Sequence, residues 1–70
     1  MKDINFDSIG KKLKEIRTHK GFTQKFVASS VKVNTSHISN IENGKVKLSL
    51  TTLVNVCNVL GTTVDYALKN

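Results

Sequence analysis

The side chains best suited to chemistry lie between Thr35 and Gly44. Ile38 and Ile41 are three residues apart, which places them on one face of a helix. The positions before and between them, from Thr35 to Asn40, are short and polar, and none is acidic, lysine or arginine. Such side chains donate and accept hydrogen bonds without presenting a fixed charge. A helix with an apolar back and a polar, uncharged front suits insertion into the major groove of DNA, where base edges carry hydrogen-bonding groups. The candidate base-contacting residues are Thr35, Ser36, His37, Ser39 and Asn40.

A second helix and a tight turn must position this face. Thr23 is a good N-cap because its hydroxyl can accept from a free backbone N–H of the first turn. Val27, Ala28 and Val31 follow at helical spacing, which predicts a helix over residues 23–30. Residues 32–34 interrupt the pattern, and Asn34 can cap the next helix, over about residues 35–43.

This stretch resembles the helix-turn-helix of Cro- and lambda-repressor-like (XRE-type) DNA-binding proteins. The resemblance rests on Phe22-Thr23-Gln24, on Val27-Ala28, on Val33, Ile38 and Ile41 as core positions, and on the closing Ile41-Glu42-Asn43-Gly44; it extends from about Ile9 to Leu68. It implies an all-α, five-helix lambda-repressor-like domain, with the helix-turn-helix formed by the second and third helices.

The sequence departs from the family pattern at three positions. Lys32 stands where a turn glycine is usual, and in a positive-φ conformation it would cost on the order of 1 kcal/mol. Leu48 replaces a proline that is usual shortly after the closing glycine. Phe26 replaces a polar residue, and packing against the loop between the third and fourth helices or contact with a partner are the two explanations.

The resemblance also implies roles for residues outside the base-reading face. Arg17, the only arginine, is expected to form a partly buried ion pair with Glu42, tying the first helix to the recognition unit. Gln24, at a helix N-terminus that favours an anion, is expected to touch a phosphate and brace the recognition helix. The expected phosphate contacts are Gln24, Asn43, Lys45 and Lys47.

The remaining chain predicts three more helices. Residues 1–6 are expected to form an N-terminal arm, and residues 7–70 a single domain. The predicted caps and ends are Asp7 with Phe6 as the preceding staple residue, Gly21, Ser49, Gly61, and Thr62 or Thr63. The predicted inward faces are Ile9, Leu13 and Ile16 in the first helix, Leu50, Leu53, Val56, Cys57 and Leu60 in the fourth, and Val64, Ala67 and Leu68 in the fifth.

Composition narrows the possible functions. The net charge of +6 on 70 residues favours nucleic acid as a partner. No apolar run approaches the roughly 18 residues of a membrane span, and no signal peptide is visible. Cys57 is the only cysteine, which excludes an intrachain disulfide and fits a reducing cytoplasm. The acids are scattered and no Cys/His spacing resembles a zinc site, so neither an enzyme, a metal nor a cofactor is expected.

The expected function is sequence-specific binding of double-stranded DNA by a transcriptional regulator, a repressor. A homodimer is expected to read a pseudo-palindromic operator, with the interface at Val64, Tyr66 and Leu68. Because the reading face lacks arginine, half-sites should lean towards A·T. The alternative is a DNA-binding antitoxin or controller subunit that also binds a partner protein, such as a toxin or another regulator.

Overall fold

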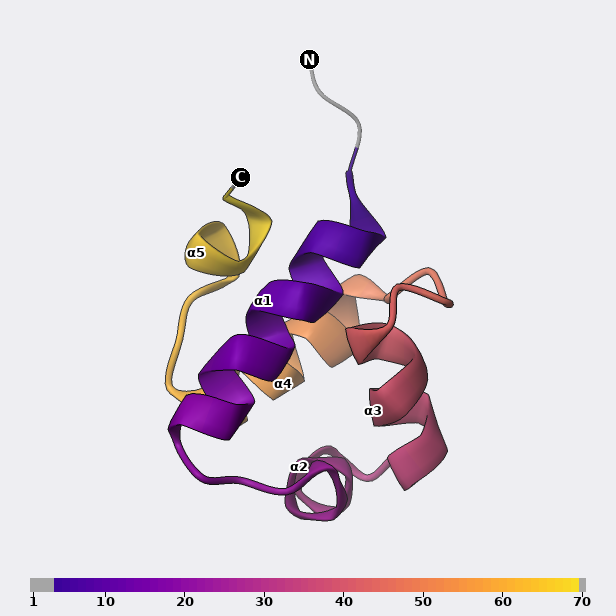
Figure 1. The fold of residues 1–70 in the computed structure, drawn as a ribbon, viewed down its shortest axis with the longest axis vertical. Helices are drawn as coiled ribbons and strands as arrows, with labels where there is room; N and C mark the ends of the chain where they lie inside the picture. Colours follow the sequence, from indigo (N-terminus) through magenta and orange to yellow (C-terminus); the bar gives the residue numbers. More distant parts are fainter. Residues whose placement is uncertain (1–3, 70) are drawn as a thin grey trace.

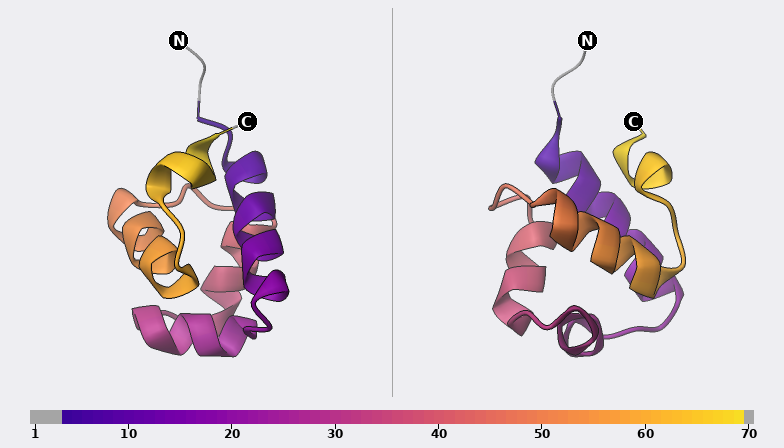
Figure 2. Two further views of the ribbon diagram at one scale, coloured as in Figure 1. Left: turned by 90° about the vertical axis from the view of Figure 1, so that its left-hand side faces the viewer. Right: turned by 180° about the vertical axis from the view of Figure 1, so that it is seen from behind.

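The computed structural model describes residues 4–69 of the chain as five α-helices. These are α1 (Phe6–His19), α2 (Gln24–Val31), α3 (Thr35–Glu42), α4 (Leu50–Leu60) and α5 (Val64–Leu68) (Figure 1). The all-α, five-helix prediction is confirmed. In all three ribbon views α2 lies at one end of the molecule, while α5 and the start of α1 lie at the other (Figures 1 and 2).

The start of α1 differs from the prediction. The N-cap is Asn5, whose side-chain oxygen accepts from the Ser8 amide at 3.1 Å, and Phe6 is already helical. Asp7 lies in the first turn, where its charge favours the helix dipole without capping it. The predicted cap, Asp7, is therefore wrong: Asn caps a helix as well as Asp does, and Asn5 lies two residues earlier. Of the expected arm, residues 1–3 lie outside the described residues.

The turn between α2 and α3 follows the predicted pattern. Thr23 accepts from the Phe26 amide at 3.0 Å, so its predicted capping role is confirmed. Lys32 ends α2 with φ 60° and ψ 45°, the left-handed conformation that its place in the turn demanded. Asn34 is the N-cap of α3 by position, but its side chain makes no capping hydrogen bond.

The predicted caps of α4 and α5 are present, whereas two inward assignments are wrong. Ser49 caps α4, Gly61 ends it at φ 69°, and Thr63 caps α5. Leu50, predicted inward, is 71% exposed, because it begins α4 at the edge of the core. Leu68, also predicted inward, is 44% exposed at the end of α5.

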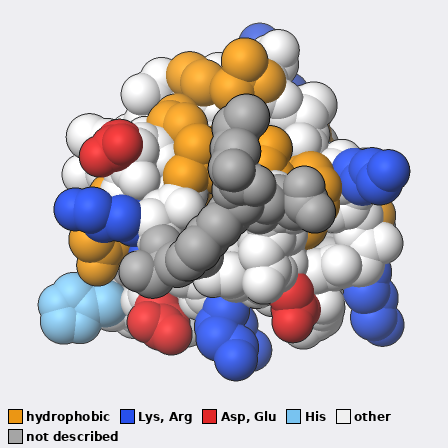
Figure 3. Space-filling view, turned by 90° about the horizontal axis from the view of Figure 1, so that it is seen from above, with side chains coloured by type: hydrophobic (Ala, Val, Ile, Leu, Met, Phe, Trp, Pro, Cys, Tyr) orange, Lys and Arg blue, Asp and Glu red, His pale blue; other side chains and the backbone are white. Residues whose placement is uncertain are grey.

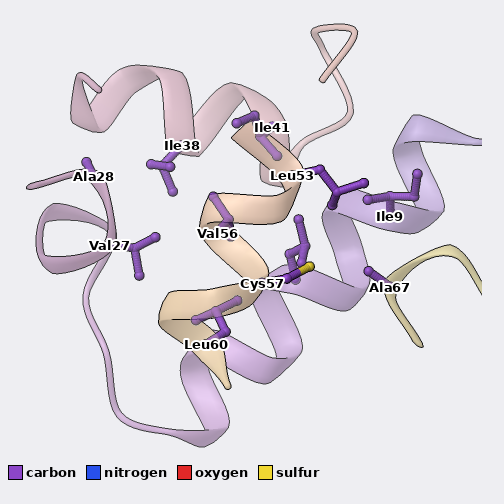
Figure 4. Close-up of a cluster of buried hydrophobic side chains, with 11 residues drawn as sticks. Ile9, Val27, Ala28, Ile38, Ile41, Leu53, Val56, Cys57, Leu60 and Ala67 are labelled. Carbon is purple, nitrogen blue, oxygen red and sulfur yellow. The ribbon is translucent and has the colours of Figure 1, made fainter. Parts of the chain in front are cut away.

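One cluster of buried side chains joins all five helices (Figure 4). Because burying apolar surface contributes roughly 25 cal/mol per Å², this cluster supplies most of the drive to fold. Cys57 is 1% exposed within it, as predicted, and burial raises the pKa of its thiol, which keeps the thiol neutral and unreactive. The members are Ile9, Leu13, Val27, Ala28, Ile38, Ile41, Leu53, Val56, Cys57, Leu60 and Ala67.

A buried ion pair fastens α1 to α3. Arg17 Nε donates to Glu42 Oε2 at 2.6 Å and Arg17 Nη2 donates to Glu42 Oε1 at 3.1 Å, the bidentate geometry that arginine and carboxylate favour. Arg17 Nη1 also donates to the carbonyl oxygen of Phe22 at 2.7 Å, which ties in the α1–α2 connection. Among the described residues, no buried side-chain nitrogen or oxygen lacks a hydrogen-bond partner.

The two helices also meet at a glycine that the sequence analysis did not single out. Gly10 is buried in α1, and a Cβ atom there would overlap the carbonyl oxygen of Ile41 near the end of α3. Backbone cannot move aside as a flexible side chain can. The close approach of α1 and α3 therefore requires glycine at this position.

None of the described helices is long and apolar enough to cross a membrane.

We expect Gly10→Ala to lower the free energy of unfolding by about 1–3 kcal/mol, because overpacking forces the two helices apart. Urea denaturation measures the change. Lys11→Ala, at the exposed neighbouring position of the same helix, is the control and should change stability little. Equal stability of the two variants would show that the helices tolerate a wider separation.

We expect Arg17→Met and Glu42→Gln each to cost roughly 3–5 kcal/mol, because each leaves a buried charge without its partner. Thermal melting with the exposed Glu15→Gln as a control would report the loss. Unchanged melting temperatures in both variants would contradict a stabilising role for the pair.

Candidate nucleic-acid interface

The exposed surface of α3 is formed by two adjacent rows of polar side chains. Residues four apart in a helix lie on one face, so Thr35, Ser39 and Asn43 make one row, and Ser36 and Asn40 the next. Thr35, Ser36 and Asn43 are exposed, while Ser39 and Asn40 are half-buried. Asn43 Nδ2 lies 3.5 Å from Ser39 Oγ, which links two members of the first row.

The fifth predicted base-contacting residue lies at the margin of this surface. His37 is half-buried and stands beyond the Ser36–Asn40 row, towards the side of α3 that carries Ile41. The opposite side of the helix is closed, because Ile38, Ile41 and Glu42 are buried. The structure thus brings the five predicted residues onto one side of α3, with His37 at the edge.

Gln24 connects this helix to the start of α2. Its Nε2 donates to Glu42 Oε1 at 2.9 Å, so Glu42 accepts from both Gln24 and Arg17. An amide nitrogen has two hydrogens, and one remains for another acceptor. Neither α2 nor α3 carries an acidic residue in its first turn, so both N-termini keep a positive dipole end.

Positive charge flanks the polar surface. The loop that leaves α3 projects from the same side of the molecule as that helix (Figure 1), and its Lys45 and Lys47 are exposed. Lys25, exposed in the first turn of α2 beside Gln24, is a charge that the sequence analysis did not assign. In the sequence, the position of Lys25 directly after Gln24, a candidate phosphate-binding residue, could have indicated a phosphate contact for it as well.

The three residues predicted for a dimer interface lie in different environments on α5. Val64 is half-buried against the core, whereas Tyr66 is 50% and Leu68 44% exposed. Lys12 holds this helix to α1: its Nζ lies 5.1 Å from the Tyr66 ring centre and donates to the carbonyl oxygens of Tyr66, at 3.3 Å, and of Lys69. These hydrogen bonds give partners to two carbonyl groups at the C-terminal end of α5 and hold that end against α1.

Phe26 is half-exposed on α2, and its aromatic neighbour is Phe22. The two ring centres are 4.8 Å apart with a 46° angle between the planes, a tilted contact of the kind aromatic pairs favour. Nearly half of the Phe26 side chain still faces outward. This leaves an aromatic surface beside the first turn of α2.

The part of the chain that the structure describes holds no cluster of three or more His, Cys, Asp or Glu residues arranged to bind a metal ion. The surface around α3 is instead built from hydrogen-bonding side chains and nearby lysines. Such a surface can read and neutralise a polyanion.

Comparison with known proteins identifies the domain. A family model described as "Helix-turn-helix" matches residues 13–66. The SPbeta prophage-derived HTH-type transcriptional regulator YonR of Bacillus subtilis is 35% identical over 60 residues, covering 86% of this chain and 56% of YonR. The HTH-type transcriptional regulator ImmR of Bacillus subtilis is 34% identical over 61 residues, covering 87% of this chain and 48% of ImmR. The chain thus spans about half the length of these curated relatives.

Solved structures show the same fold. The clp gene regulator ClgR from Corynebacterium glutamicum superposes with a TM-score of 0.89 at 28% identity, covering 97% of this chain and 72% of ClgR. The N-terminal DNA-binding domain of SinR from Bacillus subtilis gives 0.83 at 29% identity, covering 91% and 94%. SinR has also been solved with DNA and with the SinI protein. The family match, the relatives and the fold agree: this chain belongs to the XRE-type helix-turn-helix family of DNA-binding transcription regulators.

Proposed function

We propose that this chain binds double-stranded DNA sequence-specifically by placing α3 in the major groove. The observation that carries the proposal is the side of α3 that bears Thr35, Ser36, Ser39 and Asn40, which is polar, accessible and free of fixed charge. Asn40 can make the two-bond contact to adenine N6 and N7, and Thr35 can offer its methyl group to thymine. With no arginine on this side, half-sites lean towards A·T, and a guanine contact falls to His37, Lys45 or Lys47.

The phosphate backbone is held by residues around the reading surface. Gln24 and Asn43 supply neutral donors, and Lys45 and Lys47 supply charge. Gln24 donates one amide hydrogen to Glu42, and its second amide hydrogen can donate to a phosphate. Such a bond would link the Arg17–Glu42 pair to the DNA backbone and fix the register of α3 on the duplex. The net charge of +6 adds sequence-independent affinity through counterion release.

The protein acts, in this proposal, as a homodimeric repressor in the cytoplasm. One α3 reads only a few base pairs, so two copies about 34 Å apart would read a pseudo-palindromic operator from one side of the duplex. The outer surface of α5 supplies the contact, with exposed Tyr66 and Leu68 and a smaller contribution from Val64. Occupation of a promoter by such a dimer blocks transcription.

A second candidate function adds a protein partner, as in an antitoxin or a controller subunit. Phe26 favours it, because this aromatic side chain is half-exposed beside partly buried Phe22, and aromatic side chains are enriched at interfaces. The structure of SinR, a protein similar to this chain, has been solved as a complex with the SinI protein. Footprinting upstream of the protein's own gene, with and without the neighbouring gene product, distinguishes the two: a footprint that depends on that product supports the partner.

We expect Asn40→Ala to cost about 1–3 kcal/mol on the best operator and to relax base preference at one position per half-site. Selection of binding sites from random DNA, followed by titration on the selected sequence, measures both effects. Asn58→Ala, an exposed asparagine on α4, is the matched control. Identical preferred sequences from the wild type and Asn40→Ala would contradict a direct base contact by Asn40 and would indicate recognition through DNA shape.

We expect Lys47→Ala to weaken binding to all sequences alike, because a phosphate contact carries no base information. The slope of log K against log salt should fall by about one unit per subunit. Titrations at several salt concentrations, with the exposed Lys20→Ala just after the end of α1 as the control, test this. A changed base preference with an unchanged salt slope would reassign Lys47 to base contact.

A further inference from the structure

An open groove of about 360 Å³ lies between the end of α2 and the second half of α4. These two helices pack against each other, and when the molecule is seen from behind α4 faces the viewer with α2 below it (Figure 2, right). The volume falls within the range of ligand pockets, roughly 300–1,000 Å³. The lining residues are Ser30, Val31, Lys32, Asn55, Asn58 and Val59.

The lining combines an apolar floor with a polar rim. Val31 and Val59 are half-buried against the core, whereas the four polar residues are exposed. An asparagine amide both donates and accepts, and among the described residues neither Asn55 nor Asn58 bonds its amide to another protein group. The only fixed charge in the lining is the ammonium group of Lys32. The groove therefore offers unused hydrogen bonds, an apolar surface and one positive charge.

Lys32 stands at the end of this groove in a conformation that lysine rarely adopts. Its φ is 60°, and it is the only non-glycine residue with positive φ in the part of the chain that the structure describes. Its ammonium group has no acidic partner among those residues, where the one ion pair joins Arg17 and Glu42. Because a left-handed lysine is destabilising, its presence points to a use for the side chain.

We propose that this groove binds an extended segment of a partner protein, one that carries an acidic side chain beside an aliphatic one. The carboxylate pairs with Lys32, and the aliphatic side chain lies on Val31 and Val59. The peptide backbone bonds to the amides of Asn55 and Asn58. The site does not depend on DNA binding, and it is distinct from the exposed Phe26 on the first turn of α2.

The spacing of the two amides favours a peptide over a small anion. Asn55 and Asn58 are three residues apart, about 4.5 Å along the helix axis, and an extended chain advances about 3.3 Å per residue. The two amides can therefore bond to the N–H and C=O groups of neighbouring peptide units, as proteins do when they recognise extended segments. Phosphate groups are usually held by clusters of arginine, and this lining has none.

Charge complementarity selects an acidic segment. Neither α2 nor α4 contains an acidic residue, so a carboxylate meets no like charge in the helices that line the groove. The net charge of +6 also attracts acidic segments to the domain. The C-terminal end of α2 carries a partial negative charge. The carboxylate is therefore expected at the ammonium end of the Lys32 side chain, away from the helix backbone.

The groove is separate from the surfaces proposed for DNA and for a second copy. The proposed DNA contacts lie on the first turn of α2, on α3 and in the loop after α3, whereas the groove is lined by the end of α2 and by α4. The proposed contact on α5 lies at the end of the molecule opposite α2, where hydrophobic side chains gather (Figure 3). An acidic segment can therefore bind while α3 reads DNA.

The experiment selects peptides from a displayed library of short random sequences on the full-length protein, without DNA. Enriched peptides are synthesised with a fluorescent label and titrated with the protein by fluorescence anisotropy. We expect the enriched peptides to share an acidic residue next to an aliphatic one. Replacing the acidic side chain of the peptide by the corresponding amide should weaken binding at least tenfold.

Variants of the protein assign the binding to the groove. Lys32→Asn removes the charge and places a residue that tolerates the left-handed conformation, and it should weaken peptide binding at least tenfold. Asn58→Ala, which removes one of the two amides, should also weaken it. Lys25→Asn removes the same charge from an exposed position of α2 outside the groove and should bind the peptide as the wild type does. Thermal melting establishes that each variant is folded.

Other results overturn the proposal. The absence of enriched peptides, or equal binding by Lys32→Asn and Lys25→Asn, rules out an acidic segment at Lys32. If Lys32→Asn leaves the peptide bound but flattens the salt dependence of DNA binding, Lys32 contacts a phosphate. If it only lowers the melting temperature, its charge stabilises the C-terminal dipole of α2. A wild type that selects no DNA sequence would contradict the proposed function alone, because the peptide titration contains no DNA.

Discussion

The placement of the recognition helix depends on the buried contact between Arg17 and Glu42. Arg17 uses three nitrogen atoms, two towards Glu42 and one towards the Phe22 carbonyl, and Glu42 also accepts from Gln24. The Arg17–Glu42 pair therefore joins α1, the α1–α2 connection, the start of α2 and the end of α3. Because a buried charge without its partner is costly, these four parts hold together or separate together. The Gly10 contact sets the distance at which they do so.

This arrangement separates residues that hold α3 from residues that are free to read DNA. The side of α3 that bears Ile38, Ile41 and Glu42 is buried and makes the apolar and ionic contacts that hold the helix in the fold. On the polar side, the one hydrogen bond between side chains among the described residues is the 3.5 Å contact between Asn43 and Ser39. The side chains there are short, so few rotamers must be ordered when they meet a base. Lysines contact phosphates with less demand on geometry, because the ammonium group sits at the end of a flexible side chain. Two of them lie in the loop that follows α3.

The sequence predicted what local patterns and family resemblance encode. Capping hydroxyls, a turn residue with positive φ at Lys32, and the ion pair were all expected, and the structure contains them. Two features escaped because they depend on distant parts of the chain. Helical periodicity put Leu50 on the core side of α4, yet it does not say where the core ends. No local pattern marks Gly10, whose constraint comes from a carbonyl 31 positions away. Contacts to DNA and between copies lie outside a single chain, so they stay predictions.

The departures from the family pattern show which features the fold needs. Lys32 adopts the left-handed conformation without the freedom of glycine, at a cost of roughly 1–2 kcal/mol. The turn survives because packing on both sides fixes it: Val31 and Val33 flank Lys32 and both pack against the core, and Val33 donates its amide to the Ala28 carbonyl. Leu48, in place of proline, is half-buried against the same core. Turn chemistry can therefore vary where apolar neighbours hold the backbone. Arg17, Glu42 and Gly10 have no such substitute, because a buried charge and a backbone overlap cannot be relieved by packing elsewhere.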